Sequence, residues 1–114
     1  MNQQMISICQ NHDFRRVYSR GKSYVTPAVV IYVLKNRTGR VRFGITTSKK
    51  IGNAVLRNRS RRIIKEAWRQ IFPFVRPGCD YIFVARGKTP YLKMQDVKKH
   101  MQQQLGKAGF YQES

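Results

Sequence analysis

The stretch from Lys49 to Arg69 constrains the fold more than any other part of the chain. From Asn53, whose side chain can cap a helix, it has helical periodicity. At about 100° per residue, one side collects residues suited to burial: Leu56, Ser60, Ile63, Ile64, Ala67 and Ile71. The other side and its flanks are cationic or polar: Arg57, Asn58, Arg59, Arg61, Arg62, Lys65 and Arg69. We therefore expect a long helix with one buried face and one cationic face.

The cationic face is unfavourable for the stability of the helix by itself. Like charges four residues apart, such as Arg57 and Arg61, each cost a few tenths of a kcal/mol. Cations in the first turn also oppose the helix dipole, and Glu66 is the only acid in the stretch. Local rules broken repeatedly at one place indicate a functional surface, and the ligand that relieves this repulsion is a polyanion.

Composition indicates one folded domain that spans residues 1–114, with residues 1–10 expected to be flexible, and a charge that attracts nucleic acid or an anionic membrane. The 114 residues carry a formal charge of +18 and 41% hydrophobic residues, which favours a folded domain over a disordered basic arm. The longest apolar runs are too short to span a membrane, and the N-terminus lacks the features of a signal peptide. Cys9 and Cys79 form no metal or disulfide motif. We expect a cytoplasmic protein with reduced thiols.

The first half of the chain predicts a helix followed by two strands. Residues 11–13 offer capping side chains to a short helix that ends at Gly21. Val17 on this helix is expected to be buried. Residues 25–34 form a β-branched run, and residues 40–47 alternate apolar with polar side chains. These two segments predict strands joined as a hairpin.

The second half predicts a strand and a helix after the cationic helix. Residues 81–85 are apolar enough for a central strand, while Thr89 and Pro90 resemble the first residues of a helix. That helix places apolar side chains on one side and is expected to stop at Gly106. The order of elements, α-β-β-α-β-α, predicts an α+β two-layer sandwich in which helices pack on a small mixed sheet.

Residues for catalysis or metal binding are scarce. The acids and histidines are spread along the chain: His12, Asp13, Glu66, Asp80, Asp96, His100 and Glu113. None forms a motif for acid–base catalysis or has metal-ligand spacing, and residues 49–53 do not form a phosphate-binding glycine loop. We therefore expect no catalytic residue, no metal site and no cofactor in the protein itself.

Residues 48–59, followed by Arg61 and Arg62, closely resemble the arginine-asparagine-arginine signature of the bacterial ribonuclease P protein family. Residues 12–18 with Gly21 resemble the opening helix of that family, and residues 80–86 resemble its last strand. Tyr32 stands where the first strand of the family carries an aromatic residue. The resemblance implies a left-handed crossover through the signature helix, in a fold like the second domain of a small-subunit ribosomal protein.

The resemblance also implies a function. Proteins of this family bind a catalytic RNA that requires Mg²⁺ and removes the 5′ leader from precursor tRNA. The family's contacts with the catalytic RNA match Lys49, Lys50, Asn53, Arg57, Asn58, Arg59, Arg61, Arg62, Lys65 and Arg69. Its cleft for the single-stranded leader matches Phe14, Arg15, Tyr18 and Tyr32. The expected partners are these two RNAs, with no obligate protein partner and no membrane.

Two alternatives remain open at this point. A structural RNA-binding protein of the ribosomal type explains the charge and the fold equally well, and a basic helix can also enter the major groove of DNA. The roles of Phe14 and Tyr18 are open as well, because both side chains can either pack in the core or stack on unpaired bases.

Overall fold

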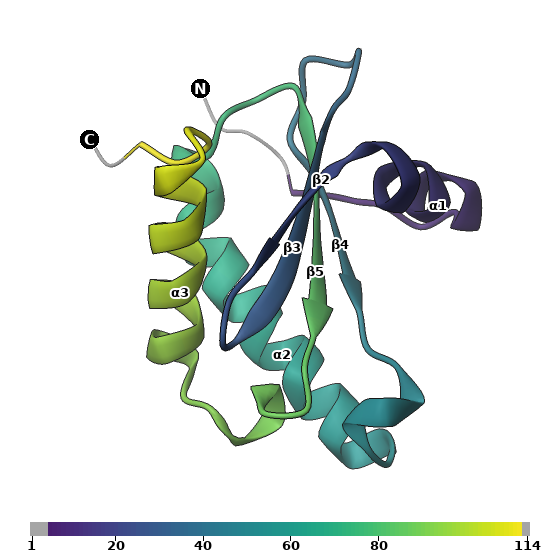
Figure 1. Ribbon diagram of the computed structural model, residues 1–114, viewed down its shortest axis with the longest axis vertical. Coiled ribbons are helices and arrows are strands. Elements are labelled where there is room, and N and C mark those ends of the chain that lie inside the picture. The colour runs from purple at the N-terminus through teal and green to yellow at the C-terminus, as the bar shows by residue number, and fades with distance from the viewer. Residues whose placement is uncertain (1–4, 113–114) are drawn as a thin grey trace.

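The computed structural model describes residues 5–112, which form five strands and three α-helices (Figure 1). The strands are β1 (Ile6–Ser7), β2 (Lys22–Val25), β3 (Val29–Lys35), β4 (Arg42–Thr46) and β5 (Cys79–Ala85). The helices are α1 (Asn11–Arg20), α2 (Ala54–Ile71) and α3 (Met94–Lys107). Short 3₁₀ turns lie at Lys49–Ile51, Phe72–Phe74 and Thr89–Tyr91. Within the described residues, no helix has the length and apolar character needed to cross a membrane.

The five strands form one mixed sheet in the order β1-β4-β5-β3-β2. The predicted central position of the 81–85 strand is confirmed, because β5 pairs antiparallel with β3 and parallel with β4. The predicted hairpin between residues 25–34 and 40–47 is wrong, since β5 lies between β3 and β4. A strand that is buried on both faces, as β5 is, gains most from neighbours on both edges.

The hairpin of this sheet is formed by β2 and β3. Residues 25–34 are not one strand, because Thr26–Ala28 turn the chain and place Val25 opposite Val30. The Thr26 hydroxyl accepts hydrogen bonds from the backbone N–H groups of Ala28 and Val29, which closes the turn. Pro27 is accommodated here because a turn needs no ladder hydrogen bond from its nitrogen.

The expected flexibility of residues 1–10 is wrong for their second half. Ile6 and Ser7 pair in parallel with Arg42 and Phe43, and Ile8 is only 6% exposed. A two-residue strand has too few side chains for its periodicity to be recognised in a sequence. Residues 1–4 lie outside the described part of the chain.

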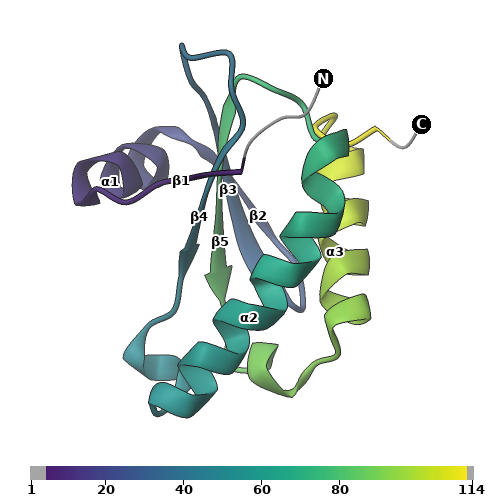
Figure 2. The same ribbon diagram turned by 180° about the vertical axis from the view of Figure 1, so that it is seen from behind.

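The sheet is covered on both faces, which confirms the α+β class. On one face, α2 and α3 pack on β3, β4 and β5 (Figures 1 and 2). Trp68 of α2 lies against Phe43, Tyr81 and Phe83 at centroid distances of 5.2–5.7 Å. On the other face, α1 covers part of the sheet and buries Val17 in a smaller cluster with Ile82. The predicted burial of Val17 is confirmed.

The connection from β4 through α2 to β5 is left-handed, as the family resemblance implied. In Figure 2, α2 passes in front of the sheet, both strands point downward, and β5 lies to the right of β4. A right-handed connection would place β5 on the left in this view. Such crossovers are rare, because strand twist favours the right-handed form in nearly every parallel pair.

Helix ends differ from the predictions wherever tertiary contacts compete with local signals. The cap of α2 is confirmed, since Asn53 Oδ1 accepts a hydrogen bond of 3.0 Å from the N–H of Leu56. Residues 11–13 lie inside α1 and do not cap it. Thr89 is buried and donates its hydroxyl to the carbonyl of Ala28, so α3 begins later, after Lys93. α3 also runs through Gly106, and Gly109 takes the positive φ of 85° after it.

Candidate RNA interface

The cationic side of α2 is solvent-exposed along its whole length. Lys49 and Lys50 precede it in a 3₁₀ turn that Ser48 caps by accepting a hydrogen bond from the N–H of Lys50. The ten residues matched to catalytic-RNA contacts are exposed except Arg57, which is half-buried. Arg57 donates to the carbonyl of Gly52 at 3.2 Å, so this side chain braces the turn into the helix.

Gly52 shapes that turn. Its φ of 134° is reached almost only by glycine, and a Cβ at this position would lie 2.7 Å from the Leu56 side chain. The chain therefore turns sharply between the two exposed lysines and the first turn of α2. This turn places the exposed Lys49 and Lys50 directly before the exposed arginines of α2.

Arg69 differs from the other cations of this surface. It forms an ion pair with Glu66, and hydrogen bonds from Arg69 and then Gln70 lower the pKa of the Glu66 carboxyl to about 2. In the described chain, this is the one ion pair on the cationic side of α2. Because its charge already has a partner, Arg69 is less available to an incoming phosphate than Arg61 or Arg62.

A groove runs along the outer edge of β4 between α1 and α2. It consists of two adjoining hollows of about 500 and 410 Å³, which share Phe14, Ile45 and Arg61 as lining residues. The first is further lined by Asn11, Arg15, Tyr18, Thr46 and Thr47. The second is further lined by Ser7, Ile8, Phe43, Gly44 and Lys65. The edge of β4 is open here because β1 pairs with only its first two residues.

Aromatic rings form the α1 wall of the groove. Phe14 and Tyr18 have ring centroids 6.3 Å apart, and the Tyr18 hydroxyl lies 2.5 Å from Thr46 Oγ1. Burial raises the pKa of Tyr18, so its hydroxyl stays protonated and keeps this hydrogen bond. Tyr32 stands behind Tyr18, edge-on at 4.9 Å, and borders neither hollow.

Of the four residues matched to leader contacts, three face the groove and one supports it. Phe14, Arg15 and Tyr18 line the first hollow, whereas Tyr32 fixes the orientation of the Tyr18 ring. The alternatives of core packing and base stacking are not exclusive. Phe14 and Tyr18 pack on the cluster around Val17 and also keep part of their rings exposed in the groove.

Arg61 connects the groove to the cationic surface of α2. Its guanidinium reaches the open edge of β4 and donates to the carbonyl of Ile45 at 3.3 Å and to Thr47 Oγ1 at 3.0 Å. The same side chain lines both hollows. The threonines and Ile45 were not predicted as site residues, because only the folded chain brings them opposite α1. Their place at the end of a half-buried strand, with Ile45 and Thr46 inside β4 and Thr47 directly after it, was the one available signal.

Acids are brought together away from this groove. Asp13 and Asp80, which are far apart in sequence, both lie beside Arg42, at 3.5 and 2.9 Å. Across residues 5–112, no three His, Cys, Asp or Glu side chains are grouped so that they could hold a metal ion. Cys9 and Cys79 are free, and burial raises the pKa of the Cys79 thiol.

Comparison with known proteins decides the family. The profile of the Ribonuclease P family matches residues 3–109. The chain belongs to the ribonuclease P protein family. It is 45% identical over 91 residues to the ribonuclease P protein component of Clostridioides difficile strain 630, covering 79% of this chain and 80% of the relative. The component from Thermoanaerobacter sp. strain X514 is 38% identical over 111 residues, covering 97% and 96%.

Solved ribonuclease P proteins have the same fold. The Staphylococcus aureus protein at 2.0 Å superposes with a TM-score of 0.83 at 30% identity, covering 96% of this chain and all of that one. The Thermotoga maritima protein has a TM-score of 0.79 at 24% identity, covering 89% and 96%, and this likeness concerns the fold alone. The mixed sheet with three helices is therefore the ribonuclease P protein fold.

Replacing Gly44 by alanine is expected to damage the groove. A Cβ at Gly44 would lie 2.7 and 2.8 Å from two atoms of the Phe14 ring, so the ring must move from its place in the α1 wall of the groove. We expect a loss of about 1 kcal/mol in leader binding, the lower end of the value of one base stack and roughly a fivefold loss of affinity. The measurement compares the affinity of the assembled ribonucleoprotein for precursor tRNA, which carries the leader, with its affinity for leaderless tRNA.

Gly87→Ala is the matched control for this prediction. Gly87 is exposed, and its added Cβ would meet no atom within 4 Å. Leader binding by the Gly87→Ala protein should equal that of the parent protein. An equal loss in both variants would show that the effect does not come from Phe14.

Proposed function

We propose that this member of the ribonuclease P protein family is the protein subunit that binds both RNAs of the enzyme. The cationic surface of α2, with Lys49 and Lys50, binds the catalytic RNA by neutralising its phosphates. The groove beside β4 holds the single-stranded 5′ leader of precursor tRNA, with Phe14 and Tyr18 offering ring faces to the bases. Stacking of this kind tolerates many sequences, as an enzyme acting on many leaders requires.

The observation that carries the proposal is the position of Arg61. This side chain belongs to the cationic surface of α2 and also lines both hollows of the groove. Two RNA surfaces that share one arginine can hold the leader next to the catalytic RNA. A protein that only binds structured RNA needs the cationic helix but has no need of an aromatic groove joined to it.

Cleavage is assigned to the RNA. The groove is lined by aromatic, aliphatic, hydroxyl, amide and cationic side chains, and the described residues that line it include no acid and no histidine. Arginine and lysine side chains there can bind phosphates and place the leader, but they are poor general bases at neutral pH. In this proposal the Mg²⁺ ions that activate water are held by the catalytic RNA, and the enzyme acts in the cytoplasm.

Precursor-tRNA cleavage at low Mg²⁺ tests the proposal. Three reactions are compared: the catalytic RNA alone, this protein alone, and both together. Cleavage that is strong only in the mixture is the expected result. Tight binding to RNA without any stimulation would favour the structural RNA-binding alternative, and preference for duplex DNA would favour the DNA-binding one. Cleavage by RNA-free protein would overturn the assignment of catalysis to the RNA.

A further inference from the structure

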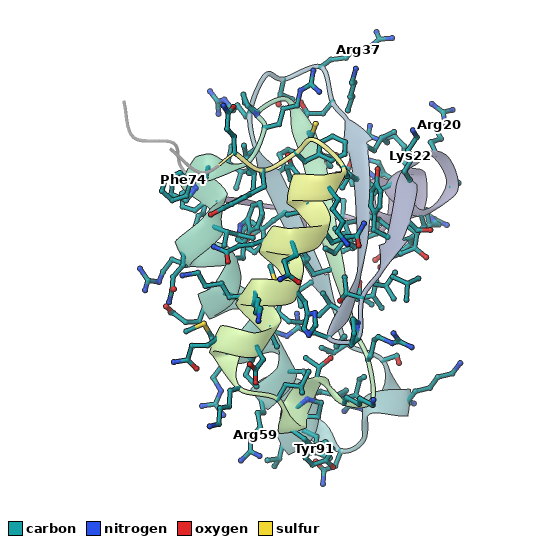
Figure 3. All side chains as sticks on the ribbon, turned by 60° about the vertical axis from the view of Figure 1, so that its left-hand side comes forward. Arg20, Lys22, Arg37, Arg59, Phe74 and Tyr91 are labelled. Atoms are coloured by element: carbon teal, nitrogen blue, oxygen red, sulfur yellow. The ribbon has the colours of Figure 1, made fainter. Side chains whose placement is uncertain are left out.

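A second cationic hollow lies on the side of α1 that faces away from the groove. Its volume is about 590 Å³, and it is enclosed by α1, the end of β3 and the loop from β3 to β4. Five cations line it: Arg16, Arg20, Lys35, Arg37 and Arg42. We name these five residues the distal cluster. In Figure 3, Arg20 and Arg37 project from one end of the molecule, whereas Arg59 of α2 lies at the opposite end.

The acids beside the distal cluster do not neutralise it. Asp80 has a fully buried side chain, and Arg42 binds it through two hydrogen bonds of 2.9 and 3.0 Å. Asp13 has a side chain only 15% exposed and is shared between Arg16 and Arg42. Within residues 5–112, the structure gives Arg20, Lys35 and Arg37 no ion-pair partner. Three exposed cations therefore remain available to a ligand.

The loop that carries Arg37 is held in place by side-chain hydrogen bonds. Asn36 donates its amide to Asp80 at 2.8 Å and to the carbonyl of Arg40 at 3.1 Å. The Asn36 carbonyl oxygen accepts from the backbone N–H and the hydroxyl of Thr38. The buried Asp80 thus anchors both Arg42 and this loop, so Arg42 and the backbone that carries Arg37 are positioned before any ligand arrives.

We propose that the distal cluster binds the phosphates of leader nucleotides upstream of those held in the groove. This proposal rests on the proposed function of the groove and extends it to a second site. The two sites share α1: Phe14, Arg15 and Tyr18 face the groove, while Asp13, Arg16 and Arg20 face the hollow. The main surface for the catalytic RNA lies on α2, which packs on the other face of the sheet.

A single strand leaving the groove can follow α1 to the distal cluster. Long single-stranded RNA is flexible, and a cationic channel that tracks its phosphates needs no base recognition. The lining of the distal hollow agrees with this role, because among the described residues it holds five cations, two polar side chains, Leu34 and the paired acid Asp13, but no aromatic ring. Leader length, rather than leader sequence, is therefore expected to control the contribution of this site.

The test uses the assembled ribonucleoprotein and two precursor tRNAs, with leaders of about 4 and about 16 nucleotides, the range of single-strand site sizes. The variant Arg20→Ala/Arg37→Ala removes two exposed cations of the distal cluster. Its matched control, Lys99→Ala/Lys107→Ala, removes two exposed lysines of α3. The two variants lose the same charge, and Lys107 and Arg20 both stand in the last turn of a helix.

For the long leader, affinity is measured between about 50 and 200 mM salt. The slope of log affinity against log salt is negative, and the loss of two phosphate contacts makes it less steep by about 1.4. Across this range the affinity of the variant should therefore fall about sevenfold less than that of the parent. The short leader and the control variant should show the parent slope. Equal slopes for the variant and the control on the long leader would overturn the proposal.

Three further outcomes separate the possible failures. A lower slope of the variant for the catalytic RNA alone, or for both leaders equally, would assign the distal cluster to the catalytic RNA and overturn the proposal. If the parent ribonucleoprotein shows no dependence on the leader at all, the proposed function of the groove fails. If the parent favours the long leader and the variant behaves as the parent does, only the distal cluster fails.

Discussion

Arg61→Ala is expected to weaken binding of both RNAs, whereas Arg62→Ala weakens binding of the catalytic RNA alone. The two arginines are neighbours on the exposed side of α2, but only Arg61 lines the groove. Loss of one charged hydrogen bond costs about 1.5–3 kcal/mol, which corresponds to a loss in affinity of roughly ten- to hundredfold. Each variant should also make the slope of log affinity for the catalytic RNA against log salt less steep by about 0.9.

The measurement has two parts. Affinity for the catalytic RNA is determined at several salt concentrations, and the assembled ribonucleoprotein is then titrated with precursor tRNA and with leaderless tRNA. Only Arg61→Ala should reduce the preference for the precursor. An equal preference in the two variants would show that Arg61 does not contact the leader. Lys107→Ala, which removes an exposed lysine of α3, serves as the charge control.

Arg42→Met is expected to destabilise the fold by about 3 kcal/mol. Asp80 is fully buried, and removal of Arg42 leaves its carboxylate with the amide of Asn36 at 2.8 Å and with Arg16 at 3.3 Å. Breaking a buried ion pair costs about 3–5 kcal/mol, and the two remaining donors place this case at the lower end. The hydrogen bonds that Arg42 donates to Asp80 raise the pKa of the Arg42 guanidinium, so Arg42 stays charged. Urea unfolding of the isolated protein measures the difference.

The double variant Arg42→Met/Asp80→Leu tests the cause of that loss. Replacing both partners removes the buried charge as well as its partner, and it should restore much of the free energy of unfolding. Arg40→Met is the control, because Arg40 is exposed and its side chain makes no ion pair in the described chain. A double variant no more stable than Arg42→Met would mean that packing, and not the charge of Asp80, causes the loss.

Local features of the sequence were sufficient to predict the helices. The periodicity of residues 53–71 and the Asn53 cap predicted α2 to within a residue, because both depend on groups within one or two turns. Trp68 was nevertheless missing from the predicted buried side, although it is fully buried. The predicted buried side of the helix is too narrow, because α2 packs against both the sheet and α3. A helix with two packing surfaces buries a wider arc than a helix with one.

Strand order could not be read in the same way. The alternation of apolar residues shows that a segment is a strand and which side chains share a face, but it does not identify the neighbouring strand. Residues 25–34 and 40–47 are close in sequence and were therefore paired. In the fold, β5 inserts between them from a segment more than thirty residues further along the chain, as the pairs Val29–Ala85 and Arg42–Asp80 show.

The candidate site likewise has one part that local sequence features predict and one part that depends on tertiary contacts. The exposed cations of α2 are local features of one helix, so the sequence located them. The groove depends on tertiary contacts: Phe14 lies over Gly44, and Arg61 reaches across the edge of β4 to Ile45. The need for glycine at position 44 cannot be recognised from the sequence, because it depends on the Phe14 ring that packs against it in the fold. The support that Tyr32 gives to Tyr18 is likewise visible only in the structure.

The central place of β5 also orders events during synthesis of the chain. Apart from the two-residue contact of β1 with β4, the β2–β3 hairpin is the one ladder in the described sheet that forms without β5. The cationic helix α2 therefore leaves the ribosome before the strand that completes its packing surface. Closure of the core waits for residue 85 and requires pairing over long sequence separations, which is intrinsically slow. During that interval the nascent chain presents arginines to an RNA-rich surrounding, and an early polyanion contact would stabilise α2 before the sheet has formed.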